Sequence, residues 1–390
     1  MKKIKINDVA VYVATILISI LISYFGSSYF MSLVPTIPSE GYKNDEFHQA
    51  KISQIVSERV ISDSFEGDLE VVFKAVISSG PFQHREITVT QIYDDAMVAQ
   101  LYPLSMGDSI VLYRSVFDQR VEWRLVSFAR SNLIGILVAL FLILIILFGR
   151  WQGFNAIVSL GFTVFAVFFI LVPAILANLN LYVITLGVAL YIIIMSFVLI
   201  GGITKKTIAA SLGCMGGILV ATLLAITFTT LMRMSGILSE DYVHLVFIEN
   251  DLPLNLTGIL FVSIVVGSLG AVMDVAMSIA SSLQELMDTA PSISVRQIIF
   301  SGMSIGKDIM GTMANTLILA YIGSSLPTIL LMIIYAKPVN LLIHSEYMAA
   351  EVLQAVAGSL GILFAIPVTS ILSAMLYRNR VKQRKLATKM

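Results

Sequence analysis

Most of the chain alternates long apolar runs with short polar segments, a pattern that predicts membrane-spanning helices. A bilayer core of about 30 Å is crossed by about 20 helical residues. Eight runs reach that length, at residues 9–30, 131–148, 154–176, 181–200, 207–231, 256–279, 309–336 and 352–377. No small-x-small cleavage site follows the first run, so we expect a retained N-terminal anchor rather than a cleaved signal peptide.

Residues 35–130 show a different pattern, in which apolar and polar positions alternate. Five stretches have this period of two, at residues 49–60, 69–77, 86–92, 109–116 and 121–128. They predict a small all-β domain similar to an OB-fold barrel. Such barrels bind oligomers on their strand faces, but we see no basic or aromatic stripe here, which favours a cap on the membrane domain or a contact with a partner.

The predicted fold is therefore an α-helical polytopic membrane protein of about eight transmembrane helices, with a small extracytoplasmic all-β domain between helices one and two. We expect four parts. They are an N-terminal anchor (1–34), the β domain (35–130), a seven-helix membrane domain (131–377) and a basic cytoplasmic tail (378–390).

The positions of lysine and arginine predict the orientation. Eight crossings place both termini on one side, and cytoplasmic segments carry an excess of basic residues. With cytoplasmic termini, the short outer loops hold only Arg233 and Lys337, whereas the inner segments hold Lys2, Lys3, Lys5, Arg150, Lys205, Lys206, Arg296, Lys307, Arg378, Arg380, Lys382, Arg384, Lys385 and Lys389. We therefore expect a cell-membrane protein with residues 35–130 outside, where the four histidines would be ordinary polar surface.

Composition excludes several classes of function. Hydrophobic residues make up 57% of the chain and charged residues 13%, and the mean hydropathy is +0.89, so a lipid bilayer is the expected surrounding. Twenty-five basic residues balance twenty-five acidic ones, so no net charge recruits nucleic acid. The one cysteine, Cys214, lies in an apolar run and has no second thiol to join, and we expect no cofactor and no metal site.

Two predicted spans carry polar residues that contact with lipid does not explain. Around GSLGAVMDVAMSIASSLQEL (267–286), small and acidic residues recur every three or four positions, so a helix places them in one stripe. A second stripe follows from SGMSIGKDIMGTMANTLILAYIG (301–323). The candidates for binding an ion or a polar solute are Asp274, Ser278, Glu285, Lys307, Asp308 and Asn315, and the glycines expected to let the helices pack closely are Gly267, Gly270 and Gly311.

The charged members of these stripes should lie away from lipid, because an unpaired charge at the bilayer centre costs about 2.5–3.5 kcal/mol. Asp274 lies 18 residues past Leu256, about 27 Å along a helix that rises ~1.5 Å per residue, so it should be near the inner end of its crossing. We expect the two stripes to pack on each other and to line an inward-facing vestibule. Residues 286–306 are rich in serine and glycine and should hinge or re-enter the membrane, and Pro327 and Pro367 predict interruptions in the last two spans.

On these residues the chain resembles the bacterial YibE/F family of multi-pass membrane proteins. The two stripe-bearing segments are the most specific part of the resemblance, and FGRWQGFNAIVSLGFT (148–163) and GGITKKTIAASLG (201–213) support it. The resemblance covers nearly the whole chain and implies an N-terminal anchor, an outer β domain and a membrane domain. It also implies a paralogous membrane partner, and it implies no particular activity.

Three functions fit the sequence. The first is transport through a site for a cation, a proton or a small polar solute, because ionisable residues inside a membrane commonly mark such a path. The second is a scaffold that transports nothing and assembles with a second copy or a paralogue. The third is an intramembrane aspartyl hydrolase built on Asp274 and Asp308, but the Gly-x-Gly-Asp motif of that class is absent and Lys307 would keep the neighbouring acid ionised, so an enzyme is not favoured.

Overall fold

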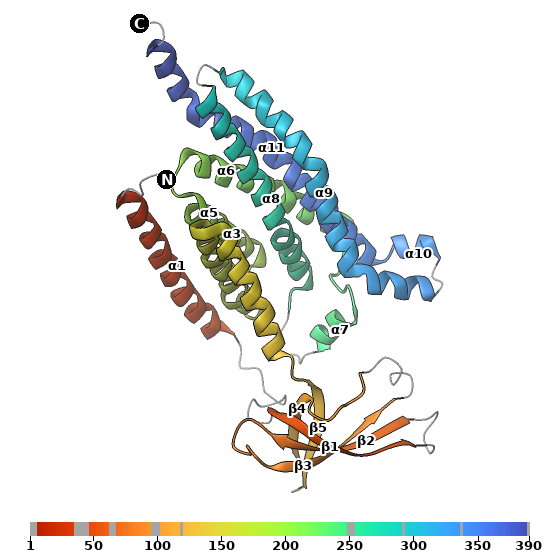
Figure 1. Cartoon of the computed structure of the whole chain (residues 1–390). Coiled ribbons are helices and arrows are strands. Elements are labelled where there is room, and N and C mark those ends of the chain that lie inside the picture. The colour runs from red at the N-terminus through yellow and green to blue at the C-terminus, as the bar shows by residue number, and fades with distance from the viewer. Residues whose placement is uncertain are drawn as a thin grey trace. The chain divides into compact units, whose positions relative to one another are not determined.

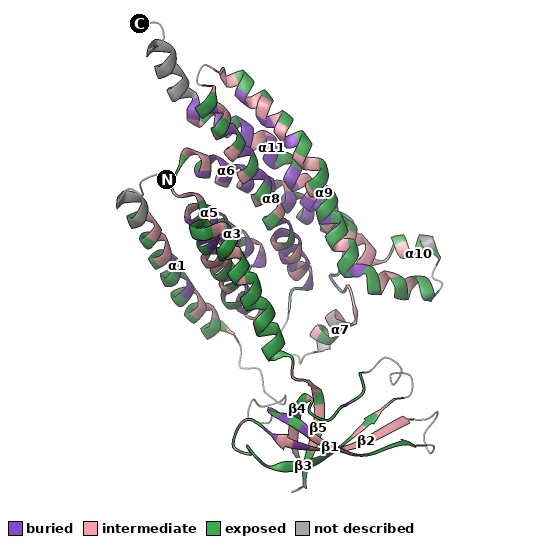
Figure 2. Cartoon of the chain, viewed as in Figure 1, coloured by how far each residue is buried: buried purple, intermediate pink, exposed green. Residues whose placement is uncertain are grey.

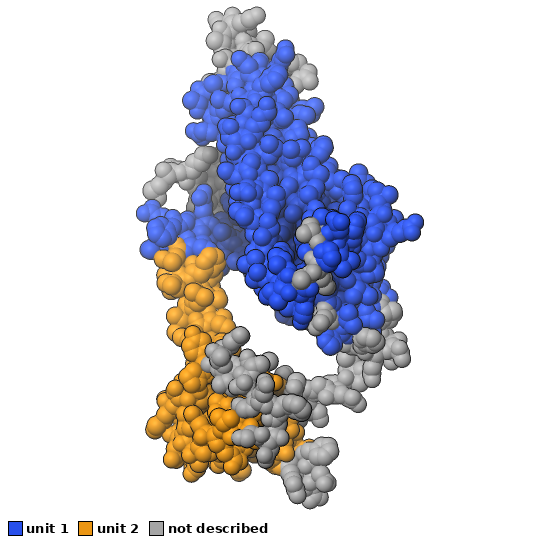
Figure 3. Space-filling model, turned by 90° about the vertical axis from the view of Figure 1, so that its right-hand side faces the viewer, with its two compact units in different colours: residues 1–35, 145–390 blue, residues 36–144 orange. Residues whose placement is uncertain are grey.

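The computed structural model describes residues 6–34, 47–61, 68–94, 102–117, 120–247, 254–290, 293–335 and 338–387 (Figure 1). The chain divides into two compact units, residues 1–35 with 145–390, and residues 36–144 (Figure 3). The first unit is helical. The second holds a β-sheet together with the first part of a long helix, α3 (Ser131–Ala166).

The sheet has five antiparallel strands, close to those that the alternation of residues predicts. They are β1 (Phe47–Ile61), β2 (Asp68–Ile77), β3 (Glu86–Tyr93), β4 (Ser109–Phe117) and β5 (Arg120–Phe128), in the order β3-β2-β1-β4-β5. Alternate side chains, such as Phe73 and Ile110, are buried in one apolar core. The edge strands β3 and β5 contact each other, but no ladder joins them among the described residues, so the closed OB-like barrel stays a prediction.

Seven helical segments among the described residues are long and apolar enough to cross a membrane. Besides α3, the helices are α1 (Ile6–Leu33), the π-helix η2 (Val167–Leu171), α4 (Val172–Leu176), α5 (Leu181–Gly201), α6 (Lys205–Leu231), α7 (Glu240–Phe247), α8 (Leu256–Thr289), α9 (Val295–Ile334), α10 (Val339–Ile343) and α11 (Glu346–Ala387). The long apolar helices confirm the prediction of a membrane protein.

One of the seven segments, Ser131–Leu176, contains a sharp bend. Arg150 has a φ of 51° and a ψ of −125°, which are not helical angles. A Cβ on Gly153 would overlap the carbonyl oxygen of Ile145, although eight residues of straight helix would separate the two by about 12 Å. The segment therefore consists of two arms that match the second and third predicted spans, and the count of eight crossings stays a prediction.

Helices α8 and α9 are longer than the spans that the sequence predicts. Most of residues 286–306 is helical, so the expected hinge or re-entrant segment is wrong for the described residues, and Pro291 lies outside them. Ser294 begins α9 with a reciprocal capping box to Gln297, which explains why a serine-rich stretch starts a helix. The expected interruptions are also wrong, because α9 and α11 continue through Pro327 and Pro367. Membrane helices tolerate proline when the surrounding protein satisfies the freed backbone groups.

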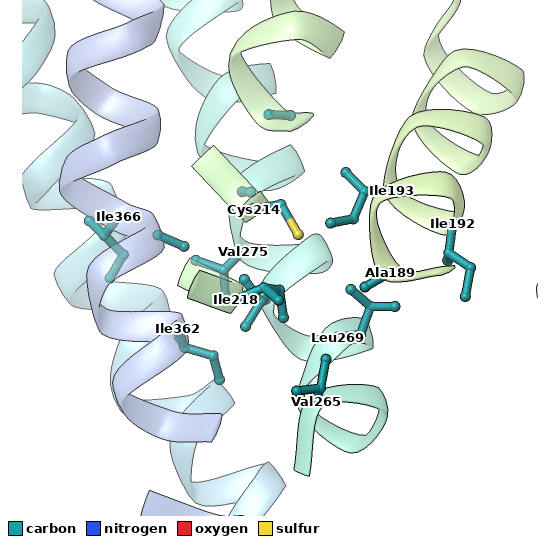
Figure 4. Packing of buried hydrophobic residues seen from close by; sticks show 14 of the residues in the cluster. Ala189, Ile192, Ile193, Cys214, Ile218, Val265, Leu269, Val275, Ile362 and Ile366 are labelled. Atoms are coloured by element: carbon teal, nitrogen blue, oxygen red, sulfur yellow. The ribbon is translucent and has the colours of Figure 1, made fainter. Parts of the chain in front are cut away.

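The core of the helical unit lies among α5, α6, α8 and α11. Figure 4 shows its apolar packing, with Ile192 and Ile193 from α5, Cys214 and Ile218 from α6, Val265, Leu269 and Val275 from α8, and Ile362 and Ile366 from α11. Helices α6 and α11 meet through small residues: a Cβ added to Gly217 would lie 2.5 Å from the carbonyl oxygen of Gly361. Lys205 joins the same two helices, because its Nζ donates a hydrogen bond of 2.8 Å to the carbonyl oxygen of Leu376.

Candidate functional site

The predicted polar stripe of α8 lies on the face of the helix opposite the core. The helix begins at Asn255, whose side chain accepts a hydrogen bond from the backbone N–H of Gly258 at 2.8 Å. Val272 and Leu283 are fully buried on one side. The members of the stripe are exposed in the chain, namely Gly267, Gly270, Asp274, Ser278 and Glu285. Helix α8 is therefore amphipathic, with an apolar side in the core and a polar side outside it.

Helix α9 turns its predicted stripe away from the helix on which it packs. A Cβ added to Gly302 would overlap Ser370 of α11, and one added to Gly306 would overlap Ile366 of α11. Asp308 follows Gly306 by two residues, which is about 200° around a helix with 3.6 residues per turn. The members of this stripe are exposed, namely Ser304, Asp308, Gly311, Thr312 and Asn315, and so is the neighbouring candidate Lys307, whereas Figure 2 shows many buried residues along α11.

Helices α8 and α9 run antiparallel at matching levels. A Cβ added to Gly358 of α11 would contact both Ser268 of α8 and Leu317 of α9. Further along, a Cβ on Gly302 of α9 would lie 3.0 Å from Leu283 of α8. Ser268 and Leu283 are as far apart along α8 as Gly302 and Leu317 are along α9. One residue forward on α8 therefore corresponds to one residue back on α9.

This register brings the two stripes to the same depth. Asp274 and Gly311 each lie six residues from the Gly358 contact, and Ser278 and Lys307 each lie ten residues from it. Asp274, Lys307 and Asp308 therefore lie within four residues of one another in depth, about 6 Å along a helix, whereas Glu285 lies further along α8. No hydrogen bond or ion pair joins the two stripes among the described residues.

The expected packing of the two stripes on each other is limited to one place. Gly267 lies against the hydroxyl of Tyr321 in α9, as a small residue at a helix contact should. A Cβ on Gly270 or Gly311 would meet nothing within 4 Å, so neither glycine has a packing partner within the described chain. The continuous seam that the sequence predicts between α8 and α9 is therefore not formed among the residues that the structure describes, because α11 packs on both helices and takes much of the contact.

Sequence reasoning missed an acidic residue in the last span. Glu351 lies five residues after the start of α11, whereas the predicted span began at residue 352. Its Oε2 atom is buried and has no hydrogen-bond partner among the described residues. Tyr321 of α9 and Tyr242 of α7 both interact electrostatically with Glu351. The pKa of Tyr242 is raised mainly by burial and further by the charge of Glu351. The signal was visible, since Glu346 and Glu351 are the only charged residues between positions 346 and 377.

The sheet also contains an aromatic cluster that the sequence analysis overlooked. His48 is 3% exposed and packs against Phe82 and Trp123, with ring centres 5.4 and 5.5 Å away, so it is not the polar surface that we expected. The guanidinium groups of Arg85 and Arg114 lie 5.4 and 4.9 Å from the centre of the Phe82 ring. These residues come from separate segments, which is why no stripe is visible along the sequence.

The long apolar helices and the charged residues on two of them define a polytopic membrane protein of the α-helical class. A family model described as YibE/F-like protein matches residues 137–379, more than half of the chain. The chain belongs to the YibE/F family. The match begins after the sheet, so α1 and the five strands lie outside it. No curated protein and no solved structure was found to match the chain.

Proposed function

We propose that this protein is a membrane transporter or channel for a cation, a proton or a small polar solute, and that its path runs along the polar faces of α8 and α9. The observation that carries the proposal is that Asp274, Lys307 and Asp308 lie within about 6 Å of one another in depth on two neighbouring helices, and are exposed outside the described core. A charge in contact with lipid costs about 2.5–3.5 kcal/mol at the bilayer centre and less towards the surface, so these side chains favour water or a partner protein over lipid. A hydrated path supplies that water.

The test is flux through the purified full-length chain in liposomes, followed with ²²Na⁺, ⁸⁶Rb⁺ and a pH-sensitive dye. We expect flux of at least one of these cations above that of protein-free liposomes, reduced at least tenfold by Asp274→Asn and by Asp308→Asn. Glu58→Gln removes a carboxylate from an exposed position of β1 and should leave the flux unchanged. Unchanged flux in both aspartate variants would remove these residues from the mechanism.

We also propose eight crossings, with both termini in the cytoplasm and the sheet outside the cell membrane. The bend at Arg150 supports two crossings within residues 131–176, and the excess of basic residues in the inner segments supports the orientation. An epitope at the C-terminus should be protected from protease in right-side-out vesicles, and cleavage there would reverse the orientation.

A scaffold that assembles with a second copy or a paralogue is the second candidate function. The exposed face of α9 favours it, because Gly311 and Asn315 point away from α11 and have the small and polar character of membrane-helix interfaces. Disulfide formation between copies of Asn315→Cys, with no flux in the liposome assay, would support the scaffold. The hydrolase needs Asp274 and Asp308 to share a proton, and no hydrogen bond joins them among the described residues.

A further inference from the structure

We propose that Glu351, Tyr321 and Ser325 form a binding site for one monovalent cation between α9 and α11. The site goes beyond the proposed function, because Glu351, Tyr321 and Ser325 are not among the residues proposed to line the path, and because it concerns binding at equilibrium. Whether this site exists does not depend on whether the chain transports anything.

Three buried oxygen atoms lack partners in this part of the bundle. They are Oε2 of Glu351, the hydroxyl oxygen of Tyr321 and Oγ of Ser325, and no described residue forms a hydrogen bond with any of them. Tyr321 interacts electrostatically with Glu351, and Ser325 lies four residues further along α9, one turn away on the same face. Ser325 is only 2% exposed. Buried polar atoms nearly always have a hydrogen-bond partner, so these three oxygen atoms indicate a bound ligand.

The position of the tyrosine hydroxyl is fixed by a small residue. It lies against Gly267 of α8, where any side chain would overlap it. On α11, Gly358 lies two turns from Glu351 and admits Leu317 of α9 into close contact. Close packing on three helices therefore holds the hydroxyl near the carboxylate.

The number and type of these atoms favour a metal cation over a proton. A cation is coordinated by several oxygen atoms at once, whereas a proton on Glu351 serves one donor–acceptor pair. Hydroxyl and carboxylate oxygens are hard ligands of the kind that alkali and alkaline-earth ions prefer. A bound cation would satisfy all three oxygens together.

The charge of the site favours a monovalent ion. Glu351 forms no ion pair among the described residues, and the described ion pairs all lie within the sheet. Among the described side chains, Tyr321 and Tyr242 interact electrostatically with it, and a phenol is neutral at physiological pH. A single carboxylate carries one negative charge, which one monovalent cation balances.

The test is the thermal stability of the purified full-length protein in nanodiscs, in NaCl, KCl or LiCl against choline chloride at equal ionic strength. A ligand that binds only the folded state stabilises it, so one alkali cation should raise the unfolding midpoint by roughly 5 °C at 100 times its dissociation constant. Glu351→Gln should abolish the shift, and Tyr321→Phe should weaken the apparent affinity at least tenfold. Tyr335→Phe, exposed at the end of α9, and Glu58→Gln should keep the full shift.

Several results would overturn the site. They are no shift with any alkali cation between pH 6 and 9, a shift that survives Glu351→Gln, a shift with Ca²⁺ or Mg²⁺ alone, and stability that depends on pH but not on the cation. If Glu351→Gln fails to fold, Tyr321→Phe replaces it as the test, because it removes one oxygen and keeps the ring. An unchanged cation affinity in Tyr321→Phe would then overturn the site. The stability test does not measure flux, so failure of this site can be distinguished from failure of the proposed transport.

Discussion

Helices α9 and α11 are the two longest helices among the described residues, with 40 and 42 residues, and both contain an internal proline. They differ in what surrounds them. Half of the most apolar stretch of α11 is buried, against 6% of that of α9. Helix α11 packs on α6, α8 and α9, whereas the far side of α9 contacts no described part of the chain.

The difference shows that small and polar residues occur in two different settings in a membrane helix. In α11 they let other helices approach, as Gly361 does with Gly217 of α6. On the outer face of α9, Gly311 has nothing near it and stands beside charged residues. Exposing such a face to lipid is energetically unfavourable, so it indicates a surface that contacts water or a partner protein.

A pair of glycine substitutions should separate the two kinds of helix surface most strongly. Gly217→Leu would drive a side chain into the backbone of α11 and should destabilise the protein by about 3 kcal/mol or more. Gly311→Leu should change the free energy of unfolding by no more than about 0.5 kcal/mol, as surface substitutions do. Thermal unfolding in detergent measures both, and equal losses would show that the outer face of α9 is packed within the chain.

Lysine provides a second matched pair with a smaller effect. Lys205→Met removes the charged hydrogen bond to the carbonyl oxygen of Leu376 and should cost about 2 kcal/mol. Lys307→Met removes an exposed charge from α9, so it should leave folding intact and reduce flux. Denaturant unfolding and the liposome assay give the two readouts, and a loss of stability in Lys307→Met would place that side chain in a structural contact.

Helix caps should show the smallest difference. Ser294→Ala removes the cap of α9 and should cost about 1 kcal/mol, or roughly fivefold faster amide hydrogen exchange in its first turns. Asn255→Ala removes the cap of α8, whose first turn is held by buried Leu256 and Leu260, so exchange there should change less. Exchange followed by mass spectrometry tests the pair, and a larger change in α8 would contradict the comparison.

The sequence predicted the strands and most helices because alternation and apolar runs are local signals. It was wrong about residues 286–306, where serine and glycine suggested a hinge but Ser294 caps a helix that packs on α11. It could not show which way Asp308 faces, since that depends on where α11 lies. Glu351 was missed because it stands at the edge of an apolar run, where hydropathy alone does not reveal burial.

Water should reach the polar faces of α8 and α9, and thiol labelling tests this claim most directly. Asp274→Cys, Asp308→Cys and Asn315→Cys would be treated in native membranes with a water-soluble or a lipid-soluble maleimide. The unmodified chain is the blank, because Cys214 is buried, and Leu319→Cys, exposed among apolar residues of α9, is the lipid-facing control. The water-soluble reagent should label positions 274, 308 and 315 but not 319. Labelling of those three positions by the lipid-soluble reagent alone, or by neither reagent, would contradict the claim.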